Sequence, residues 1–328
     1  MKLLLTGAFG NLGRCILEES SARGHEVTVF ELPTKKNKKT YKKVKKHITH
    51  MVWGDLTDKK DIERAVIQID SIIHLAAVIP PLSEMNEELC DRVNIDGTRY
   101  ILEAIEETGR QITMVYASSS SVMGDTQKMQ PPVRTEQSPE PFGNYAASKV
   151  KAEEMVLASS VPACITRFGG VLTTKTAYSL DMLVYGFEFP YRARYEVVLD
   201  IDMAAAVVNG AEKLCKNDEL NKKVFFIGGG EQNGCRIYHN ELYDKLFKAI
   251  GLTPPQEDAY ANNNPCMVDW LDTKDSQKYL EYQNHHLNHY IEHMKKKTAV
   301  YRPFLLLLNG FISRMLEKKS PYLAIKEN

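Results

Sequence analysis

The chain has 328 residues, of which 43% are hydrophobic and 26% are charged, the composition of an ordinary globular protein. Lysine and arginine together number 42, and aspartate and glutamate also number 42, which excludes a global attraction to nucleic acid or to an anionic membrane. The six cysteines form no C-x-x-C pair, so no zinc knuckle or redox motif is present and a reducing cytosol is the simplest setting.

Short apolar runs alternate with segments of helical periodicity through the first half of the chain. The first run stops at Gly7, too short for a signal peptide, and predicts a buried strand. Strands that are apolar on both faces and alternate with helices indicate an α/β fold, a doubly wound parallel sheet of the Rossmann type. The expected strands are 2–6, 26–31, 48–55, 71–77, 112–118, 163–168 and, later, 221–229; the expected helices are 11–22, 60–66, 93–107 and one that contains Tyr145.

The second half of the chain predicts a smaller lobe. We expect residues 1–170 to form an NAD-binding Rossmann domain whose sheet is completed by about 195–230. Residues 171–195 and 231–328 would then form a smaller C-terminal substrate-binding lobe and a tail. An amphipathic helix closed by a glycine is expected over 239–251.

A glycine-rich loop, TGAFGNLG, joins the first strand to the first helix. Its glycines permit a tight turn, close approach of the backbone to a pyrophosphate, and close packing of helix on strand. The second strand ends in Glu31, where a carboxylate accepts hydrogen bonds from ribose hydroxyls and repels a 2′-phosphate, which favours NAD over NADP. The expected NAD contacts in the loop are Gly7, Phe9, Gly10, Asn11, Leu12 and Gly13.

Eight lysines follow between Thr34 and Lys46. We interpret them as a solvated loop and helix face, and a grip on an anion or on a 2′-phosphate is the alternative.

Other strand ends complete the expected cofactor site. Asp55 ends the third strand, where an adenine edge would lie, and small residues after the fourth strand let the backbone approach a ribose or nicotinamide. The expected contacts are Asp55, Leu56, Leu75, Ala76, Ala77, Phe168 and Gly169.

The fifth strand ends in four serines, residues 118–121, whose hydroxyls we expect in the ligand crevice at the carboxyl end of the sheet. Tyr145 and Lys149 follow on one face of a predicted helix. An ammonium one helical turn away and an oxidised nicotinamide ring both favour the phenolate, so Tyr145 can take or give a hydroxyl proton.

This strand-end serine, followed by Y-x-x-x-K downstream of a dinucleotide loop, resembles the short-chain dehydrogenase/reductase superfamily. TGAFGNLG, GDLTD, HLAA, VNIDGT and NYAASK make the chain similar to its extended branch, the NAD-dependent epimerase/dehydratase group. The resemblance covers Met1 to about Thr173 and resumes with VVLDIDMAAAVVNGAE and KVFFIGGGE.

The resemblance implies a catalytic set. Tyr145 would transfer the proton. Lys149 would lower the pKa of Tyr145 and hold the nicotinamide ribose, and Ser119 would bind the substrate oxygen beside Ser120. Asn94 would contact the cofactor and hold a proton-relaying water, or it would serve a helix N-terminal turn. We expect a small-molecule substrate and a cytoplasmic homodimer that binds no nucleic acid.

Departures from the family pattern bear on the reaction. Ser119, Ser120 and Ser121 stand where sugar-nucleotide dehydratases resemble T-D-E, so that elimination lacks its acid and base. Gly170 replaces the asparagine of R-x-x-N, which removes a frequent contact to a nucleotide-sugar diphosphate. The leading hypothesis is an NAD-dependent oxidoreductase acting on a secondary alcohol or ketone. A sugar or nucleotide-sugar epimerase with tightly bound NAD, and a non-catalytic dinucleotide sensor, are the alternatives.

Two features near the C-terminus call for interpretation. His285, His289 and His293 align at helical spacing, but no carboxylate or cysteine completes an evident set, and we expect no metal. The apolar tail 301–322 is interrupted well short of the roughly twenty residues that a bilayer span needs. We expect it to dock on the body or on a second subunit; a lid over an apolar substrate and a membrane-surface contact are alternatives.

Overall fold

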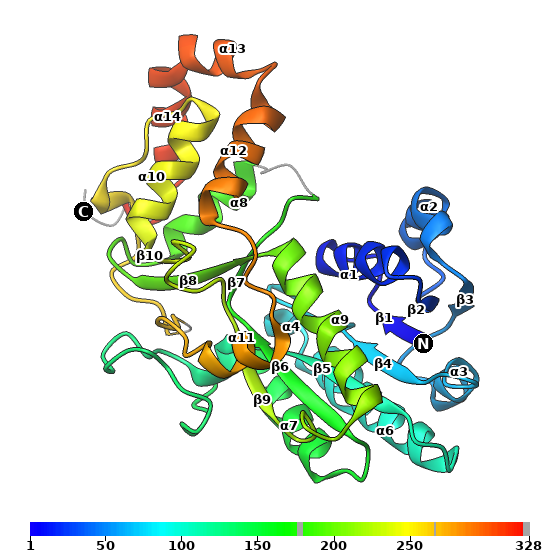
Figure 1. The fold of residues 1–328 in the computed structure, drawn as a ribbon. Helices are drawn as coiled ribbons and strands as arrows, with labels where there is room; N and C mark the ends of the chain where they lie inside the picture. The colour runs from blue at the N-terminus through cyan, green and yellow to red at the C-terminus, as the bar shows by residue number, and fades with distance from the viewer. Residues whose placement is uncertain (176–179, 266, 324–328) are drawn as a thin grey trace.

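The computed structural model describes residues 1–175, 180–265 and 267–323 (Figure 1). Seven strands form one sheet in the order β3-β2-β1-β4-β5-β6-β9, and every neighbouring pair is parallel. This confirms the predicted Rossmann-type sheet. The strand order reverses between β1 and β4, and ligands bind outside the carboxyl ends of strands at such a point. The strands are β1 (Lys2–Thr6), β2 (Glu26–Glu31), β3 (His50–Trp53), β4 (Ser71–His74), β5 (Thr113–Ser119), β6 (Ala163–Phe168) and β9 (Val224–Ile227).

Helices cover both faces of this sheet, which is why its strands read as continuous apolar runs. All four residues of β4 and all six of β6 are buried. One hydrophobic core lies between the sheet and the pair α1 and α9, and another lies between the opposite face and three helices. The helices are α1 (Asn11–Ala22) and α9 (Asp200–Lys216) on the first face, and α3 (Lys59–Ala65), α6 (Gly97–Glu107) and α7 (Gly143–Ala158) on the second.

A second group of elements has its own sheet and its own core. Its three strands run in the order β10-β8-β7, and its core includes the fully buried Phe187, Phe247 and Tyr290. Gly251, in the left-handed conformation, ends α10 as its position in the sequence predicts. The elements are β7 (Gly170–Leu172), β8 (Arg194–Leu199), β10 (Arg236–Tyr238), α10 (His239–Ile250), α12 (Leu287–Thr298), α13 (Arg302–Leu307) and α14 (Asn309–Glu317).

Shorter elements connect these layers. The lysine run forms α2, capped by the Thr34 side chain, which accepts from the backbone N of Asn37. The predicted helix over 93–107 begins as a π-helical turn before it continues as α6. The remaining elements are α2 (Lys35–Val44), α4 (Leu82–Met85), α5 (Glu87–Asp91), the π turn Arg92–Asp96, α8 (Leu180–Tyr185), α11 (Lys274–Leu280), and 3₁₀ turns at Lys45–His47, Ser120–Met123, Gly186–Glu188 and Glu257–Ala259.

The apolar tail docks one face on the second group of elements. Leu316 of α14 is fully buried in its core, and Asn309 Oδ1 accepts from the backbone N of Thr253 at 2.7 Å. Among the described residues, no helix is both long enough and apolar enough to cross a membrane.

Candidate functional site

Contacts that only glycine allows close the loop between β1 and α1. Gly7 has a φ of +73°, and a Cβ there would lie 2.8 Å from the backbone N of Ala76. A Cβ on Gly13 would lie 2.1 Å from the carbonyl O of Gly7, so α1 packs directly on the turn. A Cβ on Gly10 would meet only that carbonyl, at 3.4 Å. The open side of Gly10, at the N-terminus of α1, therefore fits the approach of a phosphate.

Glu31 lies beside this loop at the end of β2. Its Oε1 accepts from the backbone N of Phe9 at 2.8 Å, and its Oε2 accepts from Asn37 Nδ2 at 3.1 Å. Burial raises the pKa of Glu31, and the Phe9 N–H acts in the opposite direction. Each carboxylate oxygen has a second acceptor position, which leaves both oxygens able to bind a ribose hydroxyl. All eight lysines between 35 and 46 are exposed to solvent.

An aromatic cluster borders the same place, and of its three rings the sequence identifies Phe9 but not Tyr41 or Trp53. The rings of Phe9 and Trp53 lie 6.1 Å apart, and Tyr41 of α2 meets Trp53 edge-on at 5.9 Å. Trp53 ends β3 directly ahead of the expected adenine contacts, a position that could have identified it. Asp55 accepts from the backbone N two residues on, and Leu56 is buried against α6.

A buried hydrogen-bond chain fixes the loop after β4. Thr6 Oγ1 accepts from the backbone N–H groups of Leu75 and Ala76, each at 3.2 Å, and lies 2.7 Å from His74 Nδ1. His74 Nε2 lies 3.2 Å from Thr98 Oγ1. Burial lowers the pKa of His74 to about 3, so the ring is neutral at ordinary pH. The chain holds the expected cofactor segment Leu75, Ala76 and Ala77 against the glycine loop.

Glu84, which sequence reasoning did not select, anchors the start of α7. Its Oε2 accepts from the backbone N of Asn144 at 2.9 Å, and its Oε1 accepts from the backbone N of Tyr145 at 3.0 Å. Partial burial raises the pKa of Glu84, but these donors outweigh it and hold the pKa below its usual value. A carboxylate from α4 therefore positions the residue that bears the candidate phenol.

Lys149 is buried one turn further along α7. Its Nζ donates to the Ala117 carbonyl of β5 at 2.7 Å and lies 4.8 Å from the centre of the Tyr116 ring. The Tyr145 ring centre is 5.9 Å from the same atom. Burial lowers the pKa of Lys149 to about 8, while Glu153 raises it. The side chain is therefore still mainly an ammonium at pH 7.

The structure brings Tyr145 and Ser119 together. Burial raises the pKa of Tyr145 to about 12, and a hydrogen bond with Ser119 acts in the opposite direction. Among the protein's own groups, desolvation has the largest effect on this pKa, so the neutral phenol is the stable form. The phenolate expected from the sequence depends also on an oxidised nicotinamide ring. Ser119 Oγ also accepts from the backbone N of Ser121 at 3.1 Å, while Ser120 begins the 3₁₀ turn and is partly exposed.

Asn94 joins the loop after β4 to α7. Its Oδ1 accepts from the backbone N of Val78 at 2.7 Å, and its Nδ2 donates to the Val78 carbonyl and to Ser148 Oγ at 3.0 and 2.9 Å. The side chain lies on the π turn, a local geometry frequent at functional sites. Its amide hydrogens therefore link the loop after β4 to α7.

One of the four expected crevice serines points elsewhere. Ser118 is buried and donates to Glu153 Oε1 at 2.5 Å, because its side chain alternates to the opposite face of β5 from Ser119. Glu153 also pairs with Arg167, whose Nη2 lies 2.6 Å from Oε2, and Arg167 Nη1 donates to Met123 Sδ at 3.5 Å. Both charged side chains are almost fully buried. Glu153 stands at i+4 from Lys149, the spacing that could have identified it.

The other expected contacts lie at element ends. Asn11 and Leu12 begin α1, and Asn11 Oδ1 accepts from Arg14 at 3.0 Å. Phe168 ends β6 with its side chain in the core beneath α9, and the backbone N of Gly169 donates to the Ile227 carbonyl at 3.0 Å.

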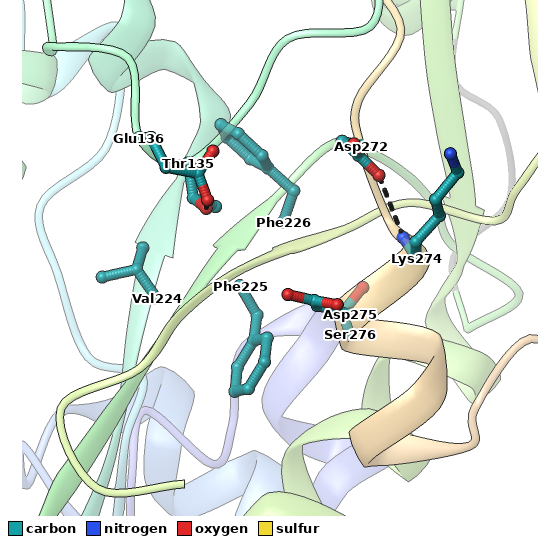
Figure 2. Close-up of a pocket in the computed structure, with 9 residues that line it drawn as sticks. All are labelled: Thr135, Glu136, Val224, Phe225, Phe226, Asp272, Lys274, Asp275 and Ser276. Carbon is teal, nitrogen blue, oxygen red and sulfur yellow. Dashed lines mark hydrogen bonds between the residues drawn. The ribbon is translucent and has the colours of Figure 1, made fainter.

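A pocket at the β9 edge of the sheet lies apart from these residues. Figure 2 shows the side chains around it, with the backbone N of Lys274 donating to Asp272. It shares no residue with the expected cofactor or substrate site. Its lining residues are Thr135, Glu136, Val224, Phe225, Phe226, Asp272, Lys274, Asp275 and Ser276.

The three helically spaced histidines do not act as one group. His285 precedes α12, and its Nδ1 lies 2.6 Å from Asp202 Oδ1, while its ring meets His289 edge-on at 4.9 Å. Among the described residues, no cluster of three or more metal-ligating side chains is found.

Comparison with known proteins places this site in context. Residues 3–172 match the NAD dependent epimerase/dehydratase family. The chain is 26% identical over 244 residues to the sterol-4-alpha-carboxylate 3-dehydrogenase, decarboxylating, of Homo sapiens, a match that covers 69% of this chain and 61% of that protein. It is 30% identical over 222 residues to the 3 beta-hydroxysteroid dehydrogenase type 7 of Rattus norvegicus, with 65% and 64% covered. The matches thus span less than two thirds of these relatives' own length.

The fold is shared with solved structures of lower identity. MoeE5 in complex with UDP-glucose and NAD aligns with a TM-score of 0.74 at 20% identity, covering 91% of this chain and 99% of that chain. The family match spans more than half of the sequence and contains the glycine loop, Ser119, Tyr145 and Lys149. The protein therefore belongs to the NAD-dependent epimerase/dehydratase family.

Proposed function

We propose that the protein is an NAD-dependent oxidoreductase acting on a secondary alcohol or ketone. The observation that carries the proposal is the arrangement of Tyr145, hydrogen-bonded to Ser119 and one helical turn from the buried ammonium of Lys149. The glycine loop, Glu31 and the Leu75–Ala77 segment would hold NAD. When bound, the nicotinamide supplies or accepts a hydride at the substrate carbon.

The chain's own residues handle the proton. Ser119 would hydrogen-bond the substrate oxygen and fix its place beside Tyr145 Oη. In the reductive direction Tyr145 Oη gives its proton to that oxygen, a role that suits a phenol whose pKa is raised to about 12. In the oxidative direction the phenol must first lose its proton, and positive charge near it, including that of Lys149, would favour the loss.

One observation favours this reading over a nucleotide-sugar epimerase that uses the same residues. The serines at 119–121 exclude only the dehydratase reaction, because they provide no carboxylate for the elimination. A Cβ at Gly170 would lie 2.1 Å from Tyr195 Oη, so the place where the family often has an amide is filled by a phenol. The similarity to two steroid dehydrogenases supports an apolar alcohol as the substrate class.

The arrangement of the chain supports further parts of the proposal. Residues 1–170, with the sheet completed within about 195–230, would bind NAD; residues 171–195 and 231–328 would supply the substrate lobe and the tail. We place the protein in the cytoplasm as a homodimer, and the five cysteines that lie within the described residues are all free, which suits a reducing compartment.

The experiment combines native mass spectrometry with a turnover screen. The protein should exchange bound NAD readily and should reduce NAD⁺ with a secondary alcohol, measured as absorbance at the nicotinamide band. NAD that stays bound through purification, together with interconversion of sugar epimers and no net NADH, would establish the epimerase instead. Reversible NAD binding with no turnover on either class would support a sensor.

A further inference from the structure

The tail surface, here residues 295–319, is apolar on two opposite sides. Leu305, Ile312 and Leu316 face the core of the smaller lobe. A helix docked by one face normally carries polar residues on the other. In Figure 1, α13 stands at the end of the molecule and α14 runs back alongside α10, away from the seven-stranded sheet.

The outward side of the tail surface is rich in large exposed apolar side chains. Contiguous apolar patches of this kind mark interaction sites rather than ordinary solvent-facing surface. Val300 and Tyr301 stand just before α13, and the exposed apolar residues that follow on α13 and α14 recur every three or four positions, the spacing of one helix face. The exposed fractions are 84% for Val300, 69% for Tyr301, 61% for Phe304, 81% for Leu307, 71% for Phe311 and 39% for Met315.

Positive charge surrounds the same side chains. Residues 295–319 contain five lysines and two arginines but one acid, Glu317, in a chain whose total charge is balanced. Lys245 and Lys248 of α10 share a hollow with Lys295, Arg302 and Glu292, and the next hollow contains Lys295, Arg302 and Leu306. Lys248 pairs with Asp244 and Lys295 pairs with Glu292, so the basic groups without a carboxylate partner in these pairs are Lys245 and Arg302. Basic groups therefore lie next to α13, on the side of Leu306.

We propose that this surface docks on an anionic lipid membrane. The aromatic and aliphatic side chains would enter the boundary between headgroups and acyl chains, and the lysines and arginines would bind lipid phosphates. A second copy of the chain fits less well, because two such surfaces brought face to face would repel each other. The contact is peripheral: the tail lies on the bilayer.

The lysine helix α2 provides the matched comparison. Its lysines are also exposed, but its only buried apolar residue is Val44 and it presents no outward apolar row. Charge alone would make α2 and the tail equivalent, whereas the proposal requires charge and apolar contact together.

The test is vesicle co-sedimentation of the full chain, independent of any enzyme assay. Vesicles of phosphatidylcholine with about one third phosphatidylserine should bind the protein, and pure phosphatidylcholine should bind it at least tenfold more weakly. Phe304→Asp with Leu307→Asp should reduce binding at least tenfold. Ile67→Asp, an equivalent change at a 62% exposed site after α3, should not. Arg314→Glu with Lys318→Glu should weaken binding more than Lys39→Glu with Lys43→Glu on α2.

Several outcomes would overturn the proposal. One is no binding to anionic vesicles; another is binding lost by the α2 variant and kept by both tail variants. A third is an Asp pair that dissociates a dimer in analytical ultracentrifugation without changing vesicle binding, which would make the tail an interface between copies. Phe311→Ser, a milder change at an exposed position, repeats the test if the Asp pair lowers the melting temperature.

Discussion

Glu153 is a buried carboxylate next to the candidate catalytic residues. It accepts four hydrogen bonds, one from Ser118 and three from Arg167, and it raises the pKa of Lys149, the residue one turn nearer the phenol. Removing one partner of a buried pair leaves an uncompensated charge, at a typical cost of about 3–5 kcal/mol. Glu153 therefore acts as a positioning residue and as a stabilising one.

Glu153→Gln should separate these two roles. The free energy of unfolding should fall by about 3–5 kcal/mol in urea titrations, and adding Arg167→Met should restore part of it. Turnover should fall at high pH as Lys149 loses its proton. In the variant this fall should occur at lower pH, because Lys149 no longer has the carboxylate that raises its pKa. A pH profile identical to that of the unmodified enzyme would show that Glu153 contributes to stability only.

His74 predicts how stability depends on pH. Its folded pKa, about 3, lies below the unfolded value of 6.5, so its contribution is complete above pH 6.5 and is lost as the pH falls toward 3. At pH 5 the loss is about 2 kcal/mol. Denaturant unfolding at pH 7.5 and pH 5 should show this difference, and His74→Gln should reduce it. An unchanged pH dependence in that variant would show that the buried ring is not its source.

At the scale of elements, we expect the junction of β2, the glycine loop and α2 to determine the preference for NAD over NADP. Glu31 connects all three, through Phe9 of the loop and Asn37 of α2. The exposed lysines of α2 compete with this effect, since they could bind a 2′-phosphate. The preference depends on whether the repulsion by the half-buried Glu31 carboxylate outweighs the attraction by exposed, solvent-screened ammonium groups.

Titration calorimetry should show NADH binding at least roughly tenfold tighter than NADPH, a difference of about 1.4 kcal/mol. Glu31→Gln should reduce the ratio of NADH to NADPH affinity, because it removes the repulsion of a 2′-phosphate. Lys42→Ala on α2 is the control and should leave this ratio unchanged. Equal affinities of the unmodified protein for NADH and NADPH would show that the lysines of α2 bind the 2′-phosphate.

For the whole molecule, the sequence predicts what depends on local pattern. Strands buried on both faces, the helix at 11–22 and the Gly251 cap all follow from periodicity and turn chemistry. Contacts between distant segments have no such signal. Glu84 reaches Tyr145 across about sixty residues, and the alternation that turns Ser118 away from Ser119 depends on where β5 ends.

The pKa values show a second limit. A sequence reveals that Lys149 follows Tyr145 by one turn, but the direction of a pKa shift depends on burial as well as on charge. Desolvation therefore opposes the shift that Lys149 and an oxidised nicotinamide ring are expected to produce at Tyr145.

The most direct test of the account compares Tyr145→Phe with Lys149→Ala. The Phe variant keeps the ring but loses the proton-transferring oxygen, so turnover should fall by roughly 10²–10⁴ with NAD affinity and folding little changed. Lys149→Ala should lower both turnover and NAD affinity, since its ammonium is assigned to both. Steady-state rates and calorimetric NAD titrations on the two variants measure this. Near-normal turnover in Tyr145→Phe would contradict the catalytic role proposed for this site.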